Sequence, residues 1–318
     1  MELSVIIVNW NTKDLLKDCL NSIKINTDNL QVKVIIADNS SHDGSREMIR
    51  SLFPDVVLIN SGGNLGFAKA NNIAIPYADA PFILFLNPDT IVLKNSLNIM
   101  IEFMKTNPSV GGLGCKMRYA DGRTQPLGLQ WFPSPLTEFI NLLFLSNRIN
   151  KKIKKYLPYH DPEQSGYVSK LYGGCLMVRK DVLDTIGYFD EQFFMYGEDV
   201  DLSRRITEAG WNLFYLAESQ IIHLCGGASS NTSSNFSILM KCESISKLMQ
   251  KYYGKMGKSL YRLLIFTGSQ LRLFVLCILY FVSSFIHEGN KTNYLDSFSK
   301  YFVMLKWSLN LQKPIIKD

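Results

Sequence analysis

Short polar side chains follow four apolar runs in the first part of the chain: Asn9, Asp38, Asn64 and Asp89. Their amide and carboxylate groups have the chemistry to hold a nucleotide, a metal ion or a hydroxyl group. Turns favour Asn and Asp in any protein, so one such residue carries little information. Four of them are better explained by a shared ligand, because ligands of open α/β sheets bind beyond the carboxyl ends of the strands.

Alternating strand and helix patterns position these residues. Continuous apolar, β-branched runs are typical of strands buried on both faces, and they occupy residues 3–9, 32–38, 56–60 and 82–89. Segments with apolar residues at helical spacing lie between them. We therefore predict an α/β fold with a doubly wound, mostly parallel sheet, in which residues 1–90 form a Rossmann-like nucleotide-binding half.

Glycine spacing argues against two classes of nucleotide-binding protein. The first strand leads into VNWNTKD, which lacks the glycines that bring a helix N-terminus against the pyrophosphate of a dinucleotide. The later SGGNLGF has the wrong spacing and follows the third strand, and the sequence contains no Walker A motif. A nicotinamide or flavin dehydrogenase and a P-loop enzyme are therefore not expected.

Two domains are expected from the change in pattern along the chain. Beyond residue 90 the strand and helix signals become less regular, but they continue to about residue 235. Residues 236–318 are helical in pattern, aromatic and basic. We predict a catalytic domain over 1–235, with its acceptor-binding and catalytic half at 91–235, followed by a helical C-terminal segment that associates with a membrane or forms oligomers.

Positive charge is concentrated in this C-terminal segment. The net charge is +6, but Lys241–Asp318 holds twelve Lys or Arg against four Asp or Glu and carries +8. A basic end of this kind could bind nucleic acid or anionic lipid. Nucleic acid is not expected, because the sequence lacks the interleaved aromatic and basic residues of an RNA-binding module. The apolar stretch Leu273–Ile286 is shorter than the ~20 residues of a membrane span and follows Arg272. We expect a helix lying in the membrane interface, with Arg and Lys reaching the head groups; packing on the catalytic domain or on a second copy stays open.

The cysteines and the first residues indicate a cytoplasmic protein. Six cysteines stand at 19, 115, 175, 225, 242 and 277 without a CxxC pair or a His–Cys cluster, as expected for reduced thiols. The opening MELSVIIVNWN is strand-like and has no basic leader, so no signal peptide is expected.

Six segments in this order resemble the family 2 glycosyltransferases with the GT-A fold, in particular the bacterial rhamnosyltransferase-like branch. The segments are SVIIVNWN, IIADNSSHDGS, NLGFAKANNIAI, FLNPDT, GGCLMVRKDVLDTIGYFDEQFFMYGEDVDLSRRITEAGW and IIHLCGGAS. The resemblance runs from about residue 3 to residue 230. It implies a nucleotide-sugar donor, a divalent metal ion and a saccharide acceptor.

The resemblance implies a donor site built from the ends of the first strands. Asp38 matches the position that accepts a hydrogen bond from the pyrimidine base, and a carboxylate there suits the imide N–H of uracil or thymine. Val8, Asn9, Asn64 and Lys69 would line the nucleoside and phosphate pocket. Lys69 is equally consistent with a solvated helix residue.

The metal site implied by the resemblance departs from the family pattern. The sequence Asn87-Pro88-Asp89 stands where the family carries its DxD motif, so Asn87 replaces the first carboxylate and remains a donor-binding residue. Asp89 is then the anionic ligand, which suffices for Mg²⁺ because substrate phosphates supply further oxygens. His223 matches a second ligand of some relatives and would favour Mn²⁺ over Mg²⁺, although a structural histidine is the alternative.

The segment GEDVDL matches the family motif that carries the general base, which the resemblance places at Asp199. Inversion needs one carboxylate to take the acceptor proton as the hydroxyl attacks opposite the leaving diphosphate. The alternative is that Glu198, Asp199 and Asp201 are acids favoured by the helix macrodipole. Gly173 and Gly174 would let the backbone approach the donor sugar or the acceptor, and they are equally consistent with turn residues.

The sequence therefore predicts a metal-dependent, inverting hexosyltransferase of cell-surface polysaccharide synthesis. The expected donor is dTDP-rhamnose, otherwise a UDP-hexose, and the expected acceptor is a saccharide or lipid-linked saccharide at the inner face of the cell membrane. Residues 131–167 and the C-terminal segment would contact the acceptor. A sugar-phosphate nucleotidyltransferase and a non-catalytic saccharide-binding protein are the alternatives, and the first of these would carry a Gly-rich first loop that is absent here.

Overall fold

The computed structural model divides into two compact units. It describes residues 1–27, 30–127, 130–144, 159–224, 234–286 and 291–316. The first unit covers Met1–Trp131 and Pro158–Asn231, together with Lys317–Asp318, and the second covers Phe132–Leu157 and Thr232–Ile316. All residues that the sequence places in the active site belong to the first unit.

Strands and helices alternate in the first half of this unit, as expected. In chain order they are β1 (Leu3–Asn9), α1 (Lys13–Asn26), β2 (Val32–Asp38), α2 (Ser45–Leu52), β3 (Val57–Asn60), α3 (Gly66–Ala74), the 3₁₀ turn η1 (Ile75–Tyr77), β4 (Phe82–Leu86), β5 (Thr90–Val92), α4 (Ser96–Thr106) and β6 (Val110–Arg118). The remaining elements of the unit are β7 (Gly166–Tyr167), β8 (Cys175–Arg179), α7 (Lys180–Ile186), α8 (Glu198–Glu208) and β9 (Asn212–His223).

One mixed sheet of nine strands forms the centre of the first unit within the described residues. Its order is β3-β2-β1-β4-β8-β6-β9-β5, with β7 paired to β9. The strands β3, β2, β1 and β4 are parallel, which confirms the α/β fold, whereas β8 runs antiparallel to both β4 and β6. The antiparallel insertion of β8 brings a second set of residues to the carboxyl edge of β4.

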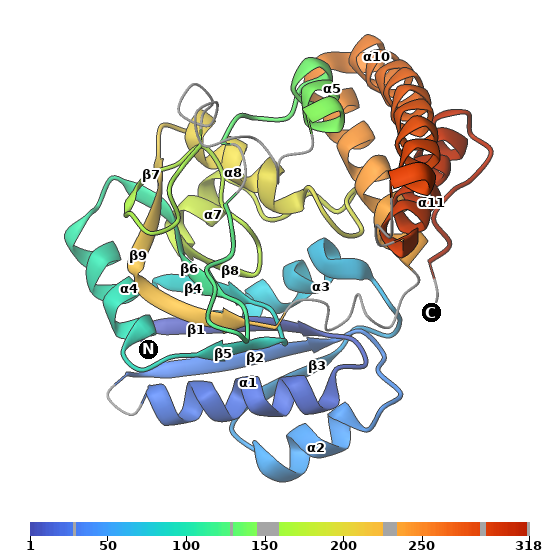
Figure 1. The fold of residues 1–318 in the computed structure, drawn as a ribbon. Coiled ribbons are helices and arrows are strands. Elements are labelled where there is room, and N and C mark those ends of the chain that lie inside the picture. The colour runs from blue at the N-terminus through green and yellow to red at the C-terminus, as the bar shows by residue number, and fades with distance from the viewer. Residues whose placement is uncertain (28–29, 128–129, 145–158, 225–233, 287–290, 317–318) are drawn as a thin grey trace. The chain divides into compact units, whose positions relative to one another are not determined.

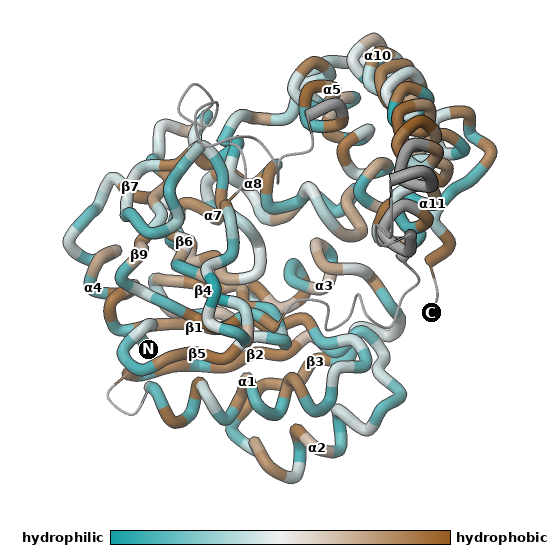
Figure 2. The backbone as a smooth tube through the Cα atoms, viewed as in Figure 1, coloured by the Kyte–Doolittle hydropathy of each residue, from teal (hydrophilic) through white to brown (hydrophobic). Residues whose placement is uncertain are grey.

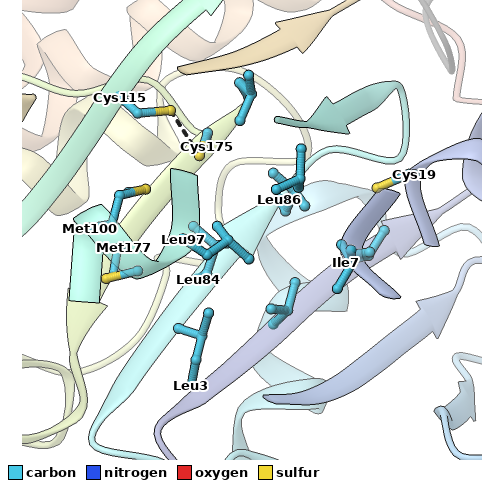
Figure 3. Close-up of a cluster of buried hydrophobic side chains, with 14 of the residues drawn as sticks. Leu3, Ile7, Cys19, Leu84, Leu86, Leu97, Met100, Cys115, Cys175 and Met177 are labelled. Atoms are coloured by element: carbon cyan, nitrogen blue, oxygen red, sulfur yellow. Dashed lines mark hydrogen bonds between the residues drawn. The ribbon is translucent and has the colours of Figure 1, made fainter. Parts of the chain in front are cut away.

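The parallel strands are mostly apolar because helices cover both faces of the sheet (Figures 1 and 2). Leu3 and Ile7 pack on one face with residues of α1 and α4. Ile6 and Val8 pack on the other face with residues of α3 and α8. Figure 3 shows the first of these clusters, in which the Cys115 and Cys175 thiols lie 3.3 Å apart.

The second unit is helical and has its own core. It contains α5 (Pro135–Phe144), α10 (Ser234–Ile286) and α11 (Lys291–Ser308), and α10 consists of two helices that meet at Gly254 (φ 68°). Tyr261 and Trp307 are buried in this core, where the Arg262 guanidinium lies 4.6 Å from the Trp307 ring centroid. The helix α5 lies within residues 131–167, the stretch expected to contact the acceptor, and it packs on α10.

One part of α10 is apolar and exposed. By length and composition, residues 235–281 of this helix qualify as a candidate membrane span. The most apolar 18 residues have a mean hydropathy of 1.8, and 17% of them are buried. The candidate span is not an uninterrupted apolar run, because Arg272 lies within it. The Arg272 side chain does not point freely to solvent: its Nε donates a hydrogen bond of 2.9 Å to the Leu142 carbonyl of α5. This bond uses one of the three guanidinium nitrogens, and the expectation that Arg272 reaches lipid head groups stays a prediction.

Candidate active site

A buried hydrogen-bond network joins the ends of β1 and β2. Asn9 and Asp38 are paired in the parallel register, and Asn9 Nδ2 donates to Asp38 Oδ2 at 2.7 Å. The backbone N–H of Ser41 donates to Asp38 Oδ1 at 2.9 Å, and Thr12 Oγ1 donates to Asn9 Oδ1 at 2.6 Å. Both oxygens of this fully buried carboxylate are thus held in place. Each carboxylate oxygen has lone pairs for a further donor.

The other residues expected at the donor pocket differ in their settings. Val8 is buried near the end of β1. Asn64 lies in the loop before α3, where its Oδ1 accepts a hydrogen bond of 3.3 Å from the Gly66 N–H. Lys69 is exposed on α3, so the solvated alternative for this lysine stays open.

The pairing of β5 with β9 brings Asp89 and His223 together. Thr90 pairs with His223 in the antiparallel register, and the Leu224 N–H donates to the Asp89 carbonyl at 2.9 Å. His223 Nε2 lies 3.3 Å from Asp89 Oδ1, and Asn87 Nδ2 lies 3.4 Å from the same nitrogen. The side chains are 6% exposed for Asp89 and 16% for His223. One carboxylate oxygen and one imidazole nitrogen therefore lie side by side, although their residues are 134 positions apart in the sequence.

Gly174 lies beside this pair. Its carbonyl accepts a hydrogen bond of 3.1 Å from the Asn87 N–H, which continues the pairing of β4 with β8. A Cβ at Gly174 would lie 3.6 Å from both Asn87 Nδ2 and His223 Cε1. These are ordinary van der Waals distances, so a ligand-binding role for Gly174 stays a prediction.

The preceding residue, Gly173, connects this pair with Asp199. The Gly173 N–H donates to Asp199 Oδ2 at 3.0 Å, and the Val200 N–H donates to Asp199 Oδ1 at 2.8 Å. Burial raises the pKa of the Asp199 carboxyl, and these two N–H donors oppose the rise only in part. A carboxylate with a raised pKa is a stronger base than an exposed one.

The three acids at the start of α8 have different environments. Asp201 is buried and forms an ion pair of 2.8 Å with Arg205, so its role is structural. Glu198 Oε2 is buried and has no hydrogen-bond partner within the described part of the chain. Burial and the nearby Asp199 charge raise the pKa of Glu198 well above its usual range, which favours its neutral form. The macrodipole alone does not account for these differences.

The backbone before α8 is strained in a way that fits a functional site. Tyr196 has φ of 66°, a conformation that non-glycine residues seldom adopt, and Gly197 follows with φ of 89°. Such conformations cluster at sites where the surrounding structure fixes the orientation of a side chain. The two residues direct the chain into α8 immediately before Glu198 and Asp199.

Sequence reasoning missed Gln125. Its Oε1 lies 3.1 Å from His223 Nδ1, and its Nε2 donates to the His223 carbonyl at 2.7 Å. A hairpin turn at Asp121-Gly122 returns the chain beside β6, where Arg118 pairs with Thr124. The turn could be predicted, but no local motif connects Gln125 with a histidine 98 positions later.

Comparison with known proteins gives the same class of enzyme. The model of the family described as Glycosyl transferase family 2 matches residues 4–187, more than half of the chain. This chain belongs to glycosyl transferase family 2. Its relatives place it in the rhamnosyltransferase-like branch, and it is a glycosyltransferase. Family membership confirms the resemblance and favours this enzyme class over a nucleotidyltransferase or a non-catalytic binding protein.

Two curated relatives are rhamnosyltransferases. The N-acetylglucosaminyl-diphospho-decaprenol L-rhamnosyltransferase of Mycobacterium tuberculosis is 29% identical over 70% of this chain and 75% of its own. Rhamnosyltransferase WbbL of Escherichia coli is 31% identical over 69% of this chain and 82% of its own.

Solved structures share the GT-A fold. The mannosyltransferase PcManGT from Pyrobaculum calidifontis, in complex with GDP-Man and Mn²⁺, has a TM-score of 0.61 at 14% identity and covers 98% of this chain and 86% of its own. GalNAc-T7 with UDP, GalNAc and Mn²⁺ has a TM-score of 0.55 at 16% identity, covering 70% of this chain and 43% of its own. At these identities the similarity establishes the fold alone.

Proposed function

We propose that this glycosyltransferase moves L-rhamnose from dTDP-rhamnose, or otherwise a hexose from its UDP derivative, to a saccharide or lipid-linked saccharide acceptor with inversion. The observation that carries this proposal is the adjacency of Gly173 and Gly174. One glycine donates to Asp199, and the next lies against Asn87 and His223. The names of two relatives support the sugar, and one of them names a diphosphate-linked polyprenol acceptor.

Asp89 and His223 fit a divalent metal ion. A carboxylate oxygen and an imidazole nitrogen suit Mn²⁺ and are acceptable to Mg²⁺, with the donor diphosphate completing the shell. Within the described residues no cluster of three or more metal-binding side chains occurs, so this site would depend on oxygens from the substrate. When bound, the ion would offset the negative charge of the leaving diphosphate. The Mn²⁺ in the PcManGT and GalNAc-T7 structures supports the choice of metal.

The protein side chains supply binding and proton transfer. Asp38, fixed by Asn9 and Ser41, would accept the imide N–H of thymine or uracil. Val8, Asn64 and Lys69 would line the remainder of the nucleotide pocket. Asp199 would take the proton of the acceptor hydroxyl as that oxygen attacks the anomeric carbon and the nucleoside diphosphate leaves.

Donor preference tests this proposal by thermal shift. With Mn²⁺ present, dTDP-rhamnose at about 100 times its Kd should raise the Tm by about 5 °C, since such saturation contributes roughly 2.7 kcal/mol. UDP-hexoses are the second expectation. A cytidine nucleotide is the matched control, because cytosine lacks the imide N–H. A proposal based on Asp38 is rejected if the cytidine nucleotide stabilises the protein as much as the uridine and thymidine nucleotides do.

We also propose that residues 1–235 form the catalytic domain and that 236–318 hold the enzyme on the inner face of the membrane. Exposed apolar residues recur on α10 at helical spacing, at Leu271, Phe274 and Ile278. The same segment carries the basic end of the chain. Anionic lipid attracts each basic residue by about 1 kcal/mol, and the apolar side chains add burial. A lipid-linked acceptor would be met at that surface.

Replacing both Phe274 and Ile278 by Gln should lower the affinity for anionic liposomes, measured by cosedimentation, by at least about tenfold. The reason is that burying each side chain in the membrane is worth ~1.5–3 kcal/mol. Raising the salt concentration should weaken binding further. Ile25→Gln is the matched control, because Ile25 is 71% exposed on α1 and Phe274 is 64% exposed. Equal binding by the double variant, or none by the unaltered protein, would reject the membrane role and favour packing between copies of the chain.

A further inference from the structure

Gln125 makes two hydrogen bonds to the same histidine residue. Its Nε2 donates to the His223 carbonyl at 2.7 Å, and its Oε1 lies 3.1 Å from Nδ1 of the His223 ring. The Gln125 side chain is buried, and its backbone N–H donates to the Met117 carbonyl at 2.8 Å. Both ends of the amide are therefore held against His223 by the hairpin that follows β6.

The orientation of this amide is determined by its neighbours. Gln125 Nε2 faces two carbonyl oxygens, that of His223 and, at 3.4 Å, that of Arg118. A carbonyl oxygen only accepts, so the group facing both of them must be the amide NH₂. The Oε1 atom then faces His223 Nδ1, and because Oε1 only accepts, Nδ1 must carry a proton.

We infer that Gln125 is a positioning residue that holds His223 in the Nδ1–H tautomer and so presents the Nε2 lone pair beside Asp89. This inference rests on the metal role in the proposed function. A bound metal ion requires an unprotonated ring nitrogen, and an acceptor on the other nitrogen fixes which one that is. The Asn87 Nδ2 atom at 3.4 Å from Nε2 is a donor and is compatible with the same tautomer.

The opposite tautomer would work against metal binding. With the proton on Nε2, His223 would donate directly to Asp89 Oδ1, which lies 3.3 Å away. Each of the two proposed ligands would then satisfy the other, and that hydrogen bond would have to break before an ion could bind. Each neutral tautomer leaves one pair of acceptors facing each other, either Nδ1 with Gln125 Oε1 or Nε2 with Asp89 Oδ1. A cation bound between Nε2 and Asp89 would relieve only the second contact, so the tautomer that Gln125 favours is the one compatible with metal.

The tautomer can be read directly in the metal-free full-length protein by ¹⁵N NMR of the imidazole nitrogens. The two tautomers are distinguishable because one nitrogen of a neutral imidazole carries a proton and the other does not. The His223 resonances are assigned by their loss in His223→Gln. We expect a protonated Nδ1 in the unaltered protein and a shift towards protonated Nε2 in Gln125→Leu.

A second readout is Mn²⁺ affinity in the presence of a nucleoside diphosphate. Loss of such a supporting partner typically weakens metal binding 10–100-fold, and we expect this for Gln125→Leu. The matched control is Gln130→Leu, since Gln130 is also buried but bonds to Leu127 and Lys170 instead.

The two readouts separate this inference from the proposed function. A protonated Nε2 in the unaltered protein, or an unchanged tautomer in a folded Gln125→Leu variant, overturns the inference. If Gln125→Leu does not fold, the tautomer in the unaltered protein still decides it. If NMR shows the expected tautomers but no variant binds Mn²⁺, the metal role is rejected. The assignment of Gln125 as the residue that fixes the His223 tautomer would still be supported.

Discussion

Asp199→Asn should lower the rate of sugar transfer by about 10²–10⁴-fold while leaving donor affinity nearly unchanged. The substitution keeps the size of the side chain and removes its ability to take a proton. The NH₂ group of the new Asn side chain will face the backbone N–H of Gly173 or of Val200, and two donors cannot bond to each other. A small loss of stability is therefore also expected. Initial rates at saturating donor, together with donor Kd, measure the two effects separately.

The pH profile adds a second criterion for Asp199. A general base works in its ionised form, and burial raises the pKa of this carboxyl above its ordinary value of about 3.9. The rate should therefore be full above the raised pKa and fall as the pH drops through it. This acid limb should disappear from the residual activity of Asp199→Asn.

Asp201→Asn is the matched control for this prediction. Asp201 lies on the same helix and is buried, but it is paired with Arg205. Its loss should reduce the free energy of unfolding and leave the rate per folded molecule close to normal. Near-normal transfer by Asp199→Asn, or an equal loss of rate per folded molecule in both variants, would contradict the assignment of the base.

Asp89→Ala should remove a metal contribution of several kcal/mol to the transfer step, because this residue is the proposed anionic ligand. His223→Ala should have a smaller effect, since a neutral imidazole provides less of the attraction for the ion. The measurement is the transfer rate as a function of Mn²⁺ concentration. We expect the midpoint to move to higher Mn²⁺ in both variants and the maximal rate to fall most in Asp89→Ala.

The control for charge loss is Asp79→Ala. Asp79 is an exposed partner of Lys33 at 2.8 Å on the surface of the same unit. An exposed ion pair of this kind contributes at most about 1 kcal/mol to stability, so activity and metal titration should be unchanged. Unaltered Mn²⁺ titrations in both Asp89→Ala and His223→Ala would show that the ion is held elsewhere.

The first part of the fold was accessible from the sequence because its signals are local. Buried parallel strands require apolar, β-branched side chains on both faces, and this pattern marks Leu3–Asn9 and Phe82–Leu86 directly. The Asn and Asp that end β1 and β2 follow from the need for polar groups at the ligand edge. Their mutual hydrogen bond follows from the parallel register of these two strands.

The remaining features depend on contacts between distant segments. Nothing in the local pattern places β8 antiparallel between β4 and β6, yet this placement brings Gly174 against Asn87. The same limit applies to Gln125, whose partner is fixed by the tertiary fold. The hydrogen bond from Arg272 to the Leu142 carbonyl of α5 likewise joins residues 130 positions apart.

Metal-dependent cleavage of a nucleotide sugar tests the central claim most directly. Water can replace the acceptor slowly, so release of nucleoside diphosphate from dTDP-rhamnose or a UDP-hexose can be followed without knowing the acceptor. We expect nucleoside diphosphate to be released when Mn²⁺ is present, and this release to be lost in EDTA and in Asp89→Ala. Release at the same rate in EDTA, or in Asp89→Ala, would contradict it.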